Sequence, residues 1–219
     1  MRNQMTRWLL FLTLFVAIGA CRTPGAANAS KPDTVQSVAL QSADIAGLQR
    51  CGESGSLASV LAQEKASNPM AYSLNATEWE QWRQVGAQDA YFAVFGRTAA
   101  DCASLTQAGT GAPKGGLMAE LVVGFKTDSV ATRSYNSGST LFGFGPRDMT
   151  FIRLLGGSVT TGSTTGLGAD SAVGRASALG TTYYFAFWQK KVFDSYLVAY
   201  DVQPFEADIA TSTANDKIH

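Results

Sequence analysis

The residue types that most often perform acid–base or nucleophilic chemistry are scarce in this sequence. The single histidine is His219, the last of 219 residues, and the end of a chain is a poor place to hold an imidazole. Serine or cysteine nucleophiles with a histidine base, and most zinc sites, need a positioned imidazole. The sequence also lacks a Gly-x-Ser-x-Gly motif. These classes of enzyme are therefore close to excluded.

Carboxylates are the remaining candidates for acid–base work. Glu78 and Glu80 lie two residues apart in a predicted helix, so their side chains point to different sides and cannot share a substrate. Carboxylates from distant segments, as in glycoside hydrolysis, stay open as an alternative. No cofactor is predicted, because no cofactor-binding motif is present.

Two glycine-rich stretches raise the question of phosphate binding. The first, from Gly109 to Gly116, does not match a phosphate loop, because Pro113 precedes Lys114 and a predicted strand follows. It is interpreted as a connecting loop. The second, from Gly162 to Gly174, could present backbone N–H groups to an anion. We favour turns for this stretch, because closely spaced glycines adopt turn conformations that other residues avoid.

The start of the chain combines positive charge with a short apolar run. Arg2 and Arg7 precede a mostly apolar stretch of 13 residues, from Trp8 to Ala20. A positive region, a short apolar region and small residues at the exit are typical of a secretory signal. A membrane-spanning helix needs about 20 apolar residues, so the stretch is expected to be removed.

The end of this apolar run resembles a known processing motif. Ile18-Gly19-Ala20-Cys21 is similar to the lipobox of bacterial lipoproteins, with Ile where that family more often has Leu. The resemblance covers about the first tenth of the chain. It implies a signal peptide over residues 1–20, diacylglycerol on the Cys21 thiol, and a lipidated N-terminus with a flexible spacer over residues 21–34. An ordinary cleaved signal is the alternative.

This resemblance also bears on the partners and the cellular location. It implies a membrane bound through lipid, on the extracytoplasmic face of the bacterial cell envelope. Removing residues 1–20 leaves 15 basic against 17 acidic residues. Because a nucleic-acid-binding surface needs clustered basic charge, no nucleic-acid partner is expected.

The cysteines follow from the same resemblance. Lipid on Cys21 leaves Cys51 and Cys102 as a pair, and in an oxidising compartment such a pair can form a disulfide. Two buried free thiols are the alternative. Neither cysteine has a second cysteine or histidine at ligand spacing, so no metal site is expected.

The elements that would position any site form one predicted domain over residues 35–219. Helices are expected over residues 56–66, 69–85, 98–107 and 127–135 and after Pro204, and strands over 90–95, 118–125, 149–155 and in a hairpin over 181–200. This order predicts an α+β fold with helices packed on a largely antiparallel sheet. It is also loosely similar to the Mog1/PsbP-like α/β/α sandwiches of small exported lipoproteins.

The hairpin is the strongest candidate for a binding surface. With a turn at Lys190-Lys191, one face would carry the aromatic residues Tyr183, Phe185, Phe187 and Tyr196. Both faces of the hairpin are apolar, so each should be covered by helices or by a ligand. The sequence therefore favours a non-enzymatic envelope protein that binds a partner protein or a small apolar ligand. An envelope enzyme and a structural subunit of an envelope complex are the alternatives.

Overall fold

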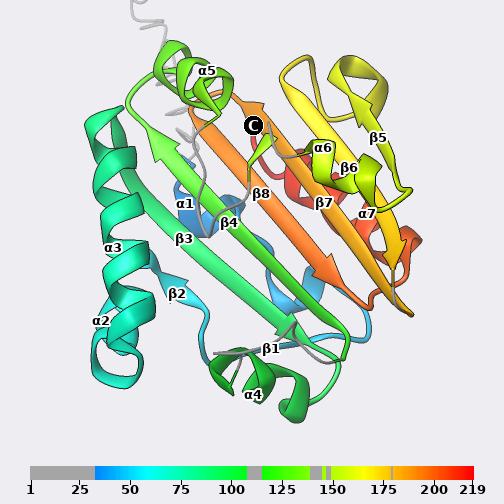
Figure 1. Ribbon diagram of the computed structural model, residues 1–219. Coiled ribbons are helices and arrows are strands. Elements are labelled where there is room, and N and C mark those ends of the chain that lie inside the picture. Colours follow the sequence, from blue (N-terminus) through cyan, green and yellow to red (C-terminus); the bar gives the residue numbers. More distant parts are fainter. Residues whose placement is uncertain (1–32, 108–114, 139–144, 147–148, 179) are drawn as a thin grey trace, which may run out of the picture. The chain divides into compact units, whose positions relative to one another are not determined.

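One antiparallel sheet organises the domain, with helices on both of its faces, as Figure 1 shows in a computed structural model. The structure describes residues 33–107, 115–138, 145–146, 149–178 and 180–219. The sheet has eight strands in the order β1-β3-β4-β8-β7-β6-β5, and β2 also pairs with β3. Residues 33–219 form one compact unit. The predicted signal peptide, Cys21, most of the spacer and most of the loop over 109–116 lie outside the described residues.

The described elements alternate between helices and strands along most of the chain. The helices are α1 (Val35–Val38), α2 (Leu57–Ser67), α3 (Pro69–Gln84), α4 (Ala99–Gln107), α5 (Asp128–Ser137), α6 (Met149–Leu154) and α7 (Pro204–Asp216), with 3-10 helices η1 (Ser42–Asp44) and η3 (Gly162–Thr165). The strands are β1 (Gln49–Arg50), β2 (Gly55–Ser56), β3 (Ala87–Gly96), β4 (Leu117–Phe125), β5 (Ser158–Thr161), β6 (Ser171–Ala178), β7 (Thr181–Lys190) and β8 (Phe193–Tyr200). Among the described helices, none is long and apolar enough to cross a membrane.

Two apolar cores lie on opposite faces of the sheet. Helices α1 and α7 cover the first face, where Val38 and Ala210 pack against Phe95, Met118 and Trp188. The second face is covered by α2, α3, α5 and α6, and its core includes, among others, Leu57, Trp82, Tyr135, Ile152, Leu121, Phe185 and Phe187. The prediction of an α+β fold is confirmed, and the layers follow the α/β/α order of the alternative.

Local capping explains why three of the predicted helices begin where they do. At the start of each helix, a side-chain oxygen accepts a hydrogen bond from the backbone N–H three positions later in the chain. The residues are Ser56 for α2, Asn68 for α3 and Thr127 for α5. Pro69 occupies the first position of α3, where a missing N–H costs nothing. These interactions are local, so the sequence alone predicts them.

One predicted strand is wrong, because residues 149–154 form helix α6. Met149 and Ile152, three positions apart, are buried against the sheet, whereas Leu154 is 80% exposed. A short apolar run fits a strand and a buried helical turn equally well. Gly174 of β6 leaves room for this packing, because a Cβ there would lie 2.8 Å from the Met149 Sδ and 3.1 Å from an Ile152 side-chain carbon.

Strands β5 and β6 were not predicted from the sequence. The sequence of β6, Ser-Ala-Val-Gly-Arg-Ala-Ser-Ala, has little β-branched or aromatic content. It becomes a strand because its backbone pairs with β7 from Ser171↔Trp188 to Ala178↔Thr181. Pairing with a strong neighbouring strand therefore overrides a weak local preference.

The predicted hairpin is present, but its register differs by two residues. Lys190 pairs with Phe193, so the turn is Lys191-Val192, and Phe185 faces Val198 instead of Tyr196. Lys191 has a φ of 52°, the left-handed conformation that two-residue hairpin turns favour. Because the shift is even, every side chain keeps its predicted face.

The structure joins Cys51 and Cys102 in the predicted disulfide, with Cα atoms 5.4 Å apart. The bond links the segment after β1 to helix α4. Gly96, at the end of β3, leaves room for it, because a Cβ there would lie 3.0 Å from the Cys102 Sγ. The cross-link thereby holds α4 against the end of β3.

Candidate functional site

The aromatic face proposed as a binding surface is part of the protein core. Phe185, Phe187 and Tyr196 are 3%, 1% and 6% exposed, and Tyr183 is partly buried. The Trp82 ring of α3 lies 5.3 Å from the Tyr196 ring. The prediction of a binding surface at these residues is therefore wrong. The sequence predicted that either helices or a ligand would cover this face, and in the structure helices cover it.

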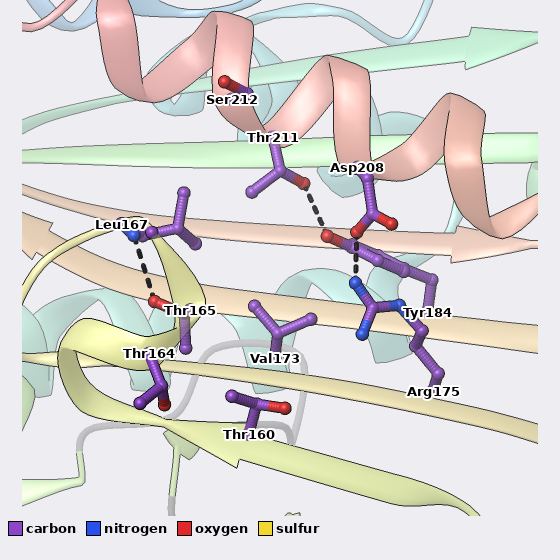
Figure 2. A pocket seen from close by; sticks show the side chains of 11 residues that line it. Thr160, Thr164, Thr165, Leu167, Val173, Arg175, Tyr184, Asp208, Thr211 and Ser212 are labelled. Carbon is purple, nitrogen blue, oxygen red and sulfur yellow. Dashed lines mark hydrogen bonds and ion pairs between the residues drawn. The ribbon is translucent and has the colours of Figure 1, made fainter.

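A polar pocket lies on the opposite face of the sheet, between α7, strands β5 to β7 and the η3 turn (Figure 2). Its volume is about 250 Å³. Its lining consists mainly of hydroxyl-bearing and charged side chains with a small apolar part, namely Thr160, Thr164, Thr165, Gly166, Leu167, Val173, Arg175, Tyr184, Asp208, Thr211 and Ser212. Polar groups that converge in a concave site can orient a ligand through hydrogen bonds.

An ion pair closes one side of this pocket. Arg175 of β6 donates from its guanidinium to the Asp208 carboxylate of α7, as Figure 2 shows. The same guanidinium lies over the Tyr184 ring of β7, 5.4 Å from its centroid. Burial raises the pKa of Tyr184 above its ordinary value, so the Tyr184 hydroxyl stays neutral. The pair and the ring therefore hold Arg175 in a defined orientation.

Hydroxyl groups define the other sides. The Tyr184 hydroxyl lies 3.1 Å from the Thr211 Oγ1, and Thr211 donates to the Ala207 carbonyl at 2.7 Å. Across the pocket, the Thr165 Oγ1 accepts the Leu167 N–H at 3.0 Å. These bonds fix the side chains before any ligand arrives.

The glycine-rich stretch over 162–174 forms the wall of the pocket. Residues 162–168 make turns, as predicted, with Gly166 at a φ of 81° after η3, whereas residues 171–174 belong to strand β6. The turn brings Leu167 down onto the sheet, where it is buried. No sequence pattern points to Arg175 or Asp208, because Arg175 lies in a stretch of small residues and Asp208 lies in helix α7, which carries no motif.

A buried carboxyl group lies on the other face, under α5. Asp194 of β8 is fully buried, and neither of its carboxylate oxygens has a hydrogen-bond partner. Burial raises the pKa of Asp194 well above its ordinary value, and the Asp170 charge reinforces this increase. The hydroxyl of Tyr196, close to Asp194, is also buried without a partner. This cluster costs stability whenever Asp194 is ionised.

We expect Asp194→Asn to stabilise the protein by about 1 kcal/mol or more at pH 7, because an unsatisfied buried polar group costs about 1–3 kcal/mol and a charged one more. The folded pKa is raised, so ionisation above the ordinary pKa favours the unfolded chain. The gain should therefore shrink as the pH falls toward 4. Urea unfolding at pH 4 and pH 7 measures it. Asp201→Asn, at an exposed site, is the control, and a destabilised Asp194→Asn protein at pH 7 would refute the prediction.

A second buried carboxyl group belongs to Glu120 of β4, which is 1% exposed. Its Oε2 accepts the Leu40 N–H at 2.6 Å, whereas its Oε1 has no hydrogen-bond partner. Burial raises the pKa of Glu120 from 4.5 to about 7, although the Leu40 N–H and the Lys217 charge oppose this increase.

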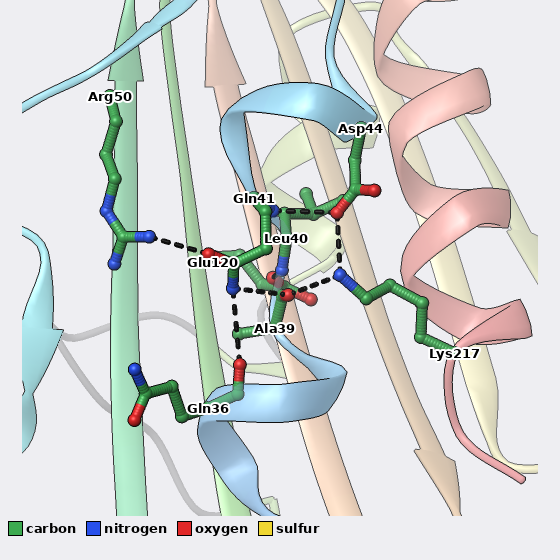
Figure 3. A network of polar contacts seen from close by, with 8 residues as sticks. All are labelled: Gln36, Ala39, Leu40, Gln41, Asp44, Arg50, Glu120 and Lys217. Atoms are coloured by element: carbon green, nitrogen blue, oxygen red, sulfur yellow. Dashed lines mark hydrogen bonds and ion pairs between the residues drawn. The ribbon is translucent and has the colours of Figure 1, made fainter.

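Polar contacts around Glu120 tie the first described segment to the end of α7, as Figure 3 shows. The Lys217 Nζ donates to the Ala39 carbonyl at 2.8 Å and to the Asp44 carboxylate at 2.6 Å. Arg50 donates to the Gln41 side chain at 2.8 Å. Segments more than 170 residues apart are thereby joined in one network.

The two carboxyls with a raised pKa do not converge. Asp194 belongs to the face with α5, and Glu120 belongs to the face with α1 and α7. Asp208 is the single carboxylate that lines the pocket among the described residues, and it is paired with Arg175. In the same part of the chain, no group of three or more His, Cys, Asp or Glu residues could hold a metal ion. Asp194 and Glu120 therefore do not form an acid–base pair with each other.

Comparisons with known proteins define no family for this chain. No protein family and no curated protein matches it. Among solved structures, it is similar to the crystal structure of the extracellular domain of PknH from Mycobacterium tuberculosis, with a TM-score of 0.46 and 11% sequence identity. That match covers 86% of this chain and 97% of the other.

Proposed function

We propose that this chain is a lipid-anchored extracytoplasmic domain that binds a small polar ligand in the pocket between α7 and strands β5 to β7. The observation that carries the proposal is the pocket itself, in which Arg175, Asp208 and a set of hydroxyls converge. The ligand is polar, in contrast to the apolar ligand that the sequence favours, because the apolar hairpin faces are both covered.

Two features support the extracytoplasmic location. The lipobox-like sequence ending at Cys21 provides the anchor, and the short polar spacer after it separates the domain from the membrane. The disulfide between Cys51 and Cys102 suits an oxidising compartment. Several acyl chains on one residue hold a protein on a membrane, since each buried methylene contributes about 0.8 kcal/mol.

Replacing the anchor cysteine tests the membrane attachment. We expect Cys21→Ser to move the protein from the membrane fraction to the soluble fraction, because serine offers no thiol for lipid transfer. The intact mass of the wild-type protein should include a diacylglycerol group. Ser30→Ala, in the spacer, should stay in the membrane fraction. A wild-type protein without lipid in its intact mass would contradict the anchor.

Filling the pocket tests the ligand site. We expect at least one compound in a library of small polar molecules to raise the Tm by about 5–10 °C at a hundredfold excess over its Kd, the shift that about 2.7 kcal/mol produces in a domain of this size. Ser212→Trp, on the wall formed by α7, should abolish this shift. Ser73→Trp places the same side chain on an exposed position of α3 and should keep it. An equal ligand-induced rise in Tm in both variants would show that the ligand binds outside this pocket.

A further inference from the structure

The dimensions of the pocket limit its ligand to a small molecule. Sites for drug-sized ligands occupy about 300–1,000 Å³, whereas this pocket has a volume of about 250 Å³. It lies against the sheet, with Leu167 and Val173 as its apolar part. A compact ring with one apolar face is therefore a better match than an extended chain.

The charges of the pocket favour a neutral ligand. Arg175 and Asp208 are the charged residues among the lining, and they neutralise each other through their ion pair. An anion would meet the Asp208 carboxylate beside the guanidinium, and a cation would meet the guanidinium beside the carboxylate, so each would be repelled by one member of the pair. A neutral molecule can bind without breaking the pair.

The hydrogen-bonding capacity of the pocket points to a ligand with several hydroxyls. A guanidinium has five N–H donors and a carboxylate has about four acceptor sites, so the pair of Arg175 and Asp208 offers both kinds of group side by side. Neighbouring hydroxyls on a ring can each accept from the guanidinium and donate to the carboxylate. The hydroxyls of Thr160 and Ser212 add groups that can both donate and accept, and the Thr164 hydroxyl, which donates to the Thr161 carbonyl at 2.8 Å, can still accept.

We infer that the ligand is a single neutral sugar ring, free or at the end of a glycan. The inference rests on the proposed function of the pocket. The ring hydroxyls contact Arg175 and Asp208, and the C–H face of the ring packs on Leu167 and Val173. Because the hydrogen-bonding groups are fixed by bonds within the protein, little side-chain ordering is needed on binding.

Calorimetric titration of the protein, purified as its own cell processes it, tests this inference. The probes are glucose, galactose, mannose and N-acetylglucosamine, their methyl α- and β-glycosides, and inorganic phosphate. We expect at least one sugar to bind and phosphate not to bind. Binding of the glycoside but not the free sugar would indicate the end of a glycan, and the reverse would indicate a free sugar.

The variant Asp208→Asn separates a sugar site from an anion site. We expect it to weaken sugar binding about 10-fold or more, because a hydrogen bond to a charged carboxylate is stronger than one to a neutral amide. An anion would instead bind more tightly, since the variant releases Arg175. Asp216→Asn, at an exposed position of the same helix, should change neither affinity. The pair is about 40% exposed, so its loss should leave the fold intact, which circular dichroism verifies.

The outcomes distinguish the inference from the proposed function. Sugar binding that Asp208→Asn weakens supports both. Phosphate binding that Asp208→Asn strengthens, or a thermal shift that Ser212→Trp abolishes with compounds other than sugars, overturns the sugar ligand and keeps the pocket. If no sugar binds and no compound in the polar library shifts the Tm, both the inference and the binding function fail.

Discussion

Replacing Cys51 and Cys102 by serine is expected to lower the free energy of unfolding by about 4 kcal/mol. The disulfide closes a loop with a sequence separation of 51 residues, and closing such a loop removes about this much entropy from the unfolded chain. At about 2–4 °C per kcal/mol, the Tm should fall by about 8–16 °C. Urea unfolding and calorimetry of the double variant measure the loss directly.

The location of the bond suggests which part of the structure loosens first. Helix α4 is held to the segment after β1 through this cross-link, and Gly96 leaves the sulfur atoms room. We therefore expect faster amide exchange over residues 99–104 in the double variant. Ser73→Ala, at an exposed position of α3, is the control and should change the unfolding free energy by less than about 0.5 kcal/mol. A loss below about 1 kcal/mol in the double variant would show that the cross-link contributes little.

The stability of the wild-type protein should fall by about 3 kcal/mol through Glu120 as the pH rises from about 4.5 to 7. The folded protein holds the Glu120 proton up to a pKa of about 7, whereas the unfolded chain releases it near 4.5. Unfolding between these pH values therefore releases a proton, and rising pH favours the unfolded state. The size follows from 1.36 kcal/mol for each unit by which the pKa is raised.

The variant Glu120→Gln isolates this effect. Glutamine can still accept the Leu40 N–H but cannot ionise, so the variant should be more stable than the wild type at pH 8 by up to about 3 kcal/mol. Near pH 4 the difference should largely vanish. Glu80→Gln removes an exposed carboxylate that lies 3.6 Å from Arg83, and it should change stability by less than about 1 kcal/mol. Urea midpoints at pH 4, 6 and 8 measure all three proteins. If Glu120→Gln keeps the wild-type pH dependence, Glu120 is not its source.

Ionisation of Glu120 should affect the segment that starts the described domain, residues 34–44, which is the part of the domain closest in sequence to Cys21. The Glu120 carboxyl accepts a hydrogen bond from the Leu40 N–H. Beside it, the Lys217 ammonium donates to the Ala39 carbonyl and the Asp44 carboxylate. Weakening of this network at higher pH should therefore appear first in residues 34–44, as faster amide exchange there than in the strands.

Several elements follow from the sequence because their determinants are local. Ser56, Asn68 and Thr127 begin helices by capping their own backbone, and the aromatic residues of β7 and β8 form a hairpin. The predicted register of that hairpin differs from the observed register by two residues. The sequence allows a turn at Lys190-Lys191 or at Lys191-Val192, and the structure has the second.

Other elements depend on neighbours that are distant in the chain. The apolar residues Met149 and Ile152 would suit a strand or a helix, and in the observed helix both pack over Gly174 of β6. The small residues of β6 become a strand because β7 pairs with them. Local preference is weak in these segments, so packing decides their structure.

From the residues alone, the α+β class, three helix starts and the hairpin could be predicted, since each depends on nearby residue types. The pairing of Cys51 with Cys102 could be predicted only with the lipobox resemblance, which sets Cys21 apart. The pocket could not be predicted in this way. Arg175 and Asp208 lie 33 residues apart on a strand and a helix, and only the docking of α7 on the sheet brings them together. The same docking buries one aromatic face of the hairpin, and the helices of the other layer bury the second face. Which polar groups converge and which apolar faces are covered is a property of tertiary packing, because one-dimensional patterns show that a face is apolar but not what lies over it.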